Sequence, residues 1–237
     1  MKNRYLSPST AAGLVTLLAL ALASGGSLAQ EKQEKPKAPE PGVPELFTLE
    51  GQFVRIAYNN EGYVSLGYRV ANQSVGGEWM LLEMGATVRT SGEYTLKREH
   101  LSIETPDGKT IQLASNQDYR AANLRALEKR ASVVRDSINY FPPGARQACP
   151  IRFFAELGGG PSLAYDQVTL SKQRACLGRV FFNIPGGIQY GQHWLNVQYE
   201  NSLVRAPFRI LTKEEEKIFS KKWKDIKKEH EKAFGKT

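Results

Sequence analysis

The chain has 237 residues, of which 32 are lysine or arginine and 24 are aspartate or glutamate, so its formal net charge is +8 at pH 7. Hydrophobic residues make up 41% of the chain, which excludes a wholly disordered protein and is enough for a domain with a real core. For an exported chain, this moderate positive charge points to anionic envelope components or acidic proteins as neighbours, and not to nucleic acid.

The first 29 residues have the order of a secretory signal peptide. Lys2 and Arg4 give a basic start, the uncharged run 11–23 is mostly apolar, and small residues lead to Ala29, after which we expect cleavage. The apolar run is shorter than the roughly 20 residues of a bilayer-spanning helix, and an uncleaved N-terminal anchor is the alternative. We therefore expect a secreted or periplasmic protein.

Residues 30–45, "QEKQEKPKAPEPGVPE", combine four prolines with alternating charges and contain no aromatic residue. Such a segment buries too little apolar surface to offset the entropy cost of ordering. We predict a disordered linker, which is either a tether for the following domain or a plain leader.

Alternation of apolar and polar residues predicts strands from residue 46 onward. The alternation is clear in 63–72 and 78–88, which each place one apolar face on a core. The connection Asn59–Gly62 suits a hairpin, and Pro106-Asp107-Gly108 is a strong turn signal between two short strands.

A helix is predicted near 116–138, where apolar residues recur at helical spacing from Leu124 to Ile138. Ser115 and Asp118 have the spacing of a capping box at its start. The polar face carries three basic residues that we take as candidate interaction residues: Arg125, Lys129 and Arg135. The alternative is a helix that covers an edge of the sheets and keeps this face in water.

The two cysteines, Cys149 and Cys176, are expected to form a disulfide, because an oxidising compartment favours pairing and no third cysteine competes. A redox or nucleophilic cysteine is the alternative, but the chain has no C-x-x-C.

The stretch 179–199, "RVFFNIPGGIQYGQHWLNVQY", is the most site-like in the chain, yet it predicts two strands joined by a loop. Pro185 and the glycines interrupt the alternation, and neither phosphate-binding glycine motif is present. We expect His193 to be a hydrogen-bonded strand or loop residue. The three histidines lie in separate elements without the spacing of metal ligands, so no metal or other cofactor is predicted.

Signatures of catalysis are also missing from the sequence, which has no G-x-S-x-G and no H-E-x-x-H. No pair of carboxylates is placed for acid–base work. We predict no catalytic residues, although a small hydrolase with a site assembled from loops such as "GGGPSLAYD" (158–166) is the alternative.

The tail 213–237 is predicted to be an amphipathic helix, with Thr212 and Glu215 as a capping box. Its apolar stripe contains the candidate interaction residues Phe219, Trp223 and Ile226. Something should cover this stripe: the domain itself, a partner protein or second copy, or a membrane surface, for which the apolar face is narrow.

Residues 46–212 together predict one domain of about nine or ten short strands with the inserted helix. A two-layer antiparallel immunoglobulin-like sandwich is the first choice, and a small closed barrel is the second. The segments "RVFFNIPGGIQYGQHWLNV" and "VRAPFRI" resemble the penultimate hairpin and last strand of bacterial exported immunoglobulin-like domains. We expect a non-catalytic envelope module that binds a protein partner or surface component, or itself, through the tail.

Overall fold

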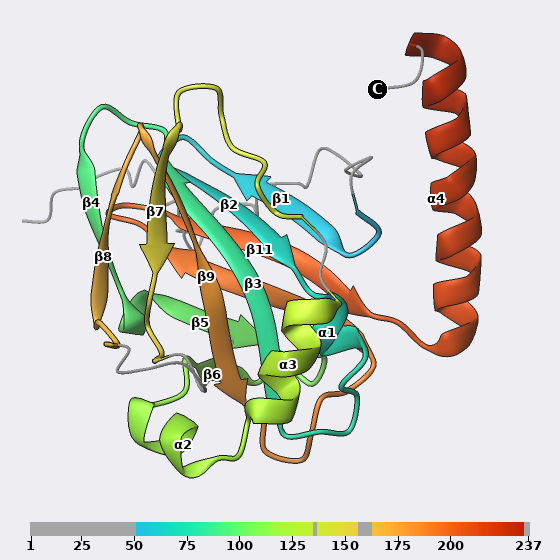
Figure 1. The fold of residues 1–237 in the computed structure, drawn as a ribbon, viewed down its shortest axis with the longest axis horizontal. Helices are drawn as coiled ribbons and strands as arrows, with labels where there is room; N and C mark the ends of the chain where they lie inside the picture. The colour runs from blue at the N-terminus through green and yellow to red at the C-terminus, as the bar shows by residue number, and fades with distance from the viewer. Residues whose placement is uncertain (1–50, 135–136, 156–162, 235–237) are drawn as a thin grey trace, which may run out of the picture. The chain divides into compact units, whose positions relative to one another are not determined.

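The computed structural model describes residues 51–134, 137–155 and 163–234. The predicted signal peptide and linker lie outside this part of the chain. The described residues form a mainly β protein with several sheets, short helices and a long C-terminal helix (Figure 1). None of the helices in these ranges is both long and apolar enough for a membrane span.

The largest sheet has five strands in the order β1-β2-β3-β9-β7. Their bounds are β1 Val54–Tyr58, β2 Gly62–Gly67, β3 Trp79–Val88, β9 Arg174–Asn183 and β7 Gln147–Ile151. Neighbours are antiparallel except at the β7 edge, where β7 pairs with β9 in parallel. The expectation of purely antiparallel pairing is therefore wrong at this edge.

A second sheet has the order β11-β10-β5-β6, and a two-stranded sheet pairs β4 with β8. Their bounds are β11 Leu203–Ile210, β10 Gly191–Gln198, β5 Leu101–Glu104, β6 Thr110–Gln112, β4 Glu93–Lys97 and β8 Gln167–Ser171. The turn predicted at Pro106-Asp107-Gly108 joins β5 to β6, and Gly108 adopts a φ of 78° there. The turn predicted at Asn59–Gly62 joins β1 to β2, with the Asn59 side chain accepting the Glu61 and Gly62 amides.

Alternate residues of the five-stranded and four-stranded sheets contribute to a single hydrophobic core, which includes Leu66, Leu82, Phe182, Leu195 and Phe208. The core explains the alternation in the sequence, because one face of each sheet points into it.

The outer face of the five-stranded sheet is buried as well, which the alternation did not predict. Ser65 is buried and donates a hydrogen bond of 2.8 Å to the carbonyl oxygen of Ile138. Gly85 leaves room for Phe141, since a Cβ at this position would lie 2.8 Å from Cζ of that ring. The segment around 138–141 therefore covers this face.

The predicted strand 63–72 ends early, and its last residues form the one-turn helix α1 (Arg69–Asn72). The side chain of Asn72 accepts a 2.6 Å hydrogen bond from the backbone amide of Leu211, far along the chain. This tertiary bond satisfies a buried donor, and it is invisible to local periodicity.

The inserted segment forms two short helices, α2 (Asn116–Ala121) and α3 (Arg125–Val133), so the expectation of one helix was wrong. Ser115 caps α2 as predicted, with its hydroxyl oxygen accepting the Asp118 amide at 3.0 Å. Tyr119 is buried with its ring centroid 4.8 Å from those of Phe154 and Phe181. Tyr119 near the end of α2 and Leu124 just before α3 are both buried, and the chain between them interrupts the single helix that the spacing predicted.

The site-like stretch 179–199 consists of two strands joined by a loop, as predicted, but the strands do not pair with each other. β9 belongs to the five-stranded sheet, whereas β10 pairs with β11 and β5. Gly187, with a φ of 88°, packs so closely that a Cβ would lie 2.6 Å from the carbonyl oxygen of Gly76. Gly187 therefore allows a close backbone approach where the chain crosses from one sheet to the other.

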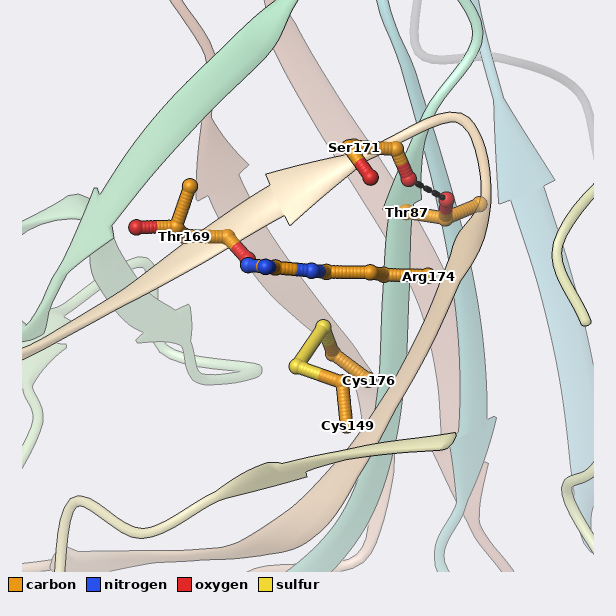
Figure 2. Close-up of a disulfide and its surroundings, with 6 residues drawn as sticks. All are labelled: Thr87, Cys149, Thr169, Ser171, Arg174 and Cys176. Carbon is orange, nitrogen blue, oxygen red and sulfur yellow. Dashed lines mark hydrogen bonds between the residues drawn. A yellow bond between two sulfur atoms is a disulfide. The ribbon is translucent and has the colours of Figure 1, made fainter. Parts of the chain in front are cut away.

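The disulfide between Cys149 and Cys176 is confirmed (Figure 2). The two cysteines are register partners on β7 and β9, with their Cα atoms 4.2 Å apart. Near the bond, Thr87 donates a 2.8 Å hydrogen bond to the carbonyl oxygen of Ser171 at the end of β8. The disulfide thus fastens the edge strand β7 to its neighbour within one sheet.

Candidate functional site

The C-terminal helix α4 (Lys213–Phe234) begins with the capping box that the sequence predicts. The Thr212 hydroxyl oxygen accepts the Glu215 amide at 3.2 Å, and a Glu215 carboxylate oxygen accepts the Thr212 amide at 2.9 Å. Glu215 also pairs with Arg209 at 2.6 Å. The Thr212 amide and then Arg209 lower the pKa of the Glu215 carboxyl, so the cap stays charged near neutral pH.

The next turn ties α4 to the strands through Phe219 and Ser220. Phe219 packs against the hydrophobic core and lies beneath the guanidinium of Arg55, whose Cζ atom is 5.5 Å from the ring centroid. The side chain of Gln52 donates a 2.8 Å hydrogen bond to the Ser220 hydroxyl. The domain therefore covers the first member of the predicted stripe.

The stripe continues beyond these ties. Trp223 is half-buried, with Nζ of Lys227 5.6 Å from its ring centroid, and Ile226 is 39% exposed. Ile218, which flanks the stripe, is 60% exposed. α4 thus carries apolar surface past the turn that is anchored to the domain.

The basic residues on the inserted segment lie elsewhere. Arg125 and Lys129 are exposed on α3, which packs near α1, and Arg135 lies outside the described residues. Arg130, which the sequence did not single out, donates to the carbonyl oxygen of Gln73 and to the Ser74 hydroxyl. The structure gives Arg125 and Lys129 no partner that would join them to the stripe on α4.

His193 lies in β10, is buried and forms a hydrogen bond, which agrees with the predicted strand or loop position. Its Nδ1 donates to the carbonyl oxygen of Gly191 at 3.1 Å, and its ring stacks on Phe208 with centroids 5.2 Å apart. Nε2 is buried and has no hydrogen-bond partner among the described residues. Burial lowers the pKa of His193, against the opposing effects of the Gly191 carbonyl and Asp107.

We expect His193 to make the protein less stable in mild acid. The folded state binds a proton less readily than the unfolded state, so the free energy of unfolding falls as the pH drops below about 6.5. The limiting slope of one proton is about 1.4 kcal/mol per pH unit. Urea unfolding of the protein and of His193→Gln between pH 8 and 5 measures the difference.

The variant loses this contribution, so its curve should be flatter than that of the parent. Equal slopes for His193→Gln and the parent would contradict the assignment. We also predict that His193→Gln changes no metal content.

The other side chains that could take part in catalysis or metal binding form structural contacts. Both cysteines are in the disulfide, and Tyr94 contacts the ring of His100 at 2.7 Å. Within residues 51–134, 137–155 and 163–234, no group of three or more histidine, cysteine or acidic side chains is placed to hold a metal.

Two charged side chains, Glu61 and Arg98, form hydrogen bonds between distant segments that the sequence analysis did not predict. Glu61, in the β1–β2 turn, accepts the Ser202 hydroxyl at 2.7 Å and the Asn201 amide at 3.0 Å, joining that turn to the β10–β11 turn. The Ser202 bond is the largest cause of its lowered pKa. Arg98, in the 3-10 helix Arg98–His100, donates to the carbonyl oxygens of Phe153 and Ala114. No local signal marks either tie, since the partners are remote in sequence.

Comparison of the chain with known protein families, curated proteins and solved structures finds no match.

Proposed function

We propose that the protein is a non-catalytic module that acts outside the cytoplasm and binds a protein partner or envelope surface component through α4. The observation that carries this proposal is the apolar stripe that continues past its anchor. Phe219 is packed on the domain, whereas Ile226, two turns further, is 39% exposed.

The energetics of α4 support the proposal. A helix of 22 residues is about 33 Å long, and an isolated helix with few apolar residues is marginal in water. The capping box, Phe219 and Ser220 stabilise its first two turns. A partner that covers the later stripe would bury side chains worth about 1.5–3 kcal/mol each when fully buried.

The finer fold belongs to the same proposal. We infer an immunoglobulin-like sandwich from the five-stranded and four-stranded sheets that share one core. The disulfide within one sheet and the parallel β7–β9 pair differ from the usual arrangement, in which the bond joins the two sheets. An experimentally determined structure tests this assignment.

A photo-crosslinking residue placed at position 226 tests the binding face. In the producing cells it should give a discrete crosslinked species, because the stripe faces the partner. Position 120 is the control, since it is exposed on α2 and is not part of α4. Equal crosslinking from both positions, or only intramolecular products from position 226, would contradict the proposal.

A further inference from the structure

Five lysines follow one face of α4. Lys213, Lys217, Lys221, Lys224 and Lys228 are spaced by four, four, three and four residues, which keeps them in a single row. All five are exposed. Across the described part of the chain, none of them has a carboxylate within ion-pair distance. We call this row the lysine face.

The lysine face is opposite the apolar stripe. Lys217 and Lys221 are each two residues from Phe219, and Lys224 and Lys228 are each two residues from Ile226, so each is rotated by about 200° from its stripe member. The first four lysines, with Glu216 and Ser220, line an open hollow of about 500 Å³. The two faces can therefore hold different ligands.

Like charges four residues apart on a helix repel one another. Acidic residues three or four positions away, such as Glu214 and Asp225, offset part of this repulsion, and a ligand with negative charges along its length would offset the rest. The row is about 22 Å long, with about 6 Å between successive lysines four residues apart. α4 contains no arginine, so its cations act as separate point charges and not as bidentate forks.

Three kinds of partner do not match the chemistry of the lysine face: a protein interface, a lipid surface and single-stranded nucleic acid. A protein interface has an apolar centre and is depleted of lysine, which the lysine face does not match. A helix lying in a lipid surface presents its apolar side to the acyl chains with basic residues beside it, whereas here the two are opposed. Single-stranded nucleic acid needs aromatic side chains for stacking among the cations, and Phe219 and Trp223 are not on this face.

We propose that the lysine face binds a linear acidic polysaccharide that carries carboxylates at regular intervals. This inference rests on the proposed function in taking α4 as an interaction element outside the cytoplasm, but it uses the face opposite the crosslinking position 226. The ligand lies along the row, and its carboxylates neutralise successive lysines.

Binding of the full-length protein to an oligogalacturonate of about ten sugars, measured by calorimetry at low salt, tests the proposal. The affinity should fall steeply as salt is added, as for any contact that releases counterions. Lys217→Gln/Lys221→Gln/Lys224→Gln should weaken binding about tenfold or more. The control Arg120→Gln/Lys172→Gln/Lys222→Gln has the same net charge and should stay within about twofold of the parent.

Equal losses in the two triple variants would overturn the proposal, because net charge alone would then explain binding. Stronger binding to oligothymidylate or to phosphatidylglycerol vesicles would also overturn it, as would no binding to the oligogalacturonate at low salt. Circular dichroism should show unchanged helix content in both variants. Crosslinking from position 226 reads the other face, so its outcome separates failure of this inference from failure of the proposed function.

Discussion

Arg98→Met is expected to be among the most destabilising single substitutions in this protein. The guanidinium of Arg98 donates to the carbonyl oxygens of Phe153 and Ala114, and its Cζ atom lies 4.6 Å from the ring centroid of Phe154. These partners follow β7 and β6, while Arg98 itself stands between β4 and β5. One side chain therefore connects segments that extend from all three sheets.

Methionine keeps the length of the side chain but leaves both carbonyl oxygens without a donor. Each unsatisfied buried group costs about 1–3 kcal/mol, so for two groups we expect a total loss of about 2–6 kcal/mol in the free energy of unfolding. Guanidinium unfolding followed by tryptophan fluorescence measures it. Burial lowers the pKa of Arg98, opposed by Asp166, but arginine stays charged at every pH of interest.

Two further variants separate the contact from the charge. Arg98→Lys keeps a cation but has no fork to reach two carbonyls at once, so an intermediate loss is expected. Arg120→Met removes an exposed arginine of α2 and should change stability by about 0.5 kcal/mol or less. If Arg98→Met were as mild as Arg120→Met, the bridging role would be wrong.

Loss of the disulfide is the second large effect that we expect. The bond closes a loop with a sequence separation of 27 between Cys149 and Cys176. The loop-entropy model predicts that its removal costs about 3.5 kcal/mol. The double variant Cys149→Ala/Cys176→Ala is preferable to serine, because Cys176 is fully buried and a hydroxyl there would need a partner.

The variant should still fold, since the backbone ladder between β7 and β9 remains. Its urea midpoint should be lower, and amide exchange should increase in β7, the edge strand. Peptide mapping of the unreduced parent should find one crosslinked pair. Unchanged stability in the double variant, or two alkylatable thiols in the unreduced parent, would contradict the role assigned to this bond.

The sequence by itself determined the features whose cause is local. Alternation located most strands, Asn59 and Gly108 marked turns, and Thr212 with Glu215 marked the start of α4. Cysteine pairing was also readable, because the chain has only two. In each case the residues involved are close in sequence or leave a single choice.

Tertiary structure decided the rest, because the partners are far apart along the chain. The end of a predicted strand forms α1 instead, where Asn72 accepts the Leu211 amide, and Tyr119 packs on the core where one continuous helix was expected. The buried ring of His193 stacks on Phe208 of the neighbouring strand, and Arg98 donates to carbonyl oxygens on two other segments. Helical geometry alone places the lysine face opposite the apolar stripe. Only the tertiary structure shows that Phe219 packs on the core while Ile226, later in the stripe, stays exposed.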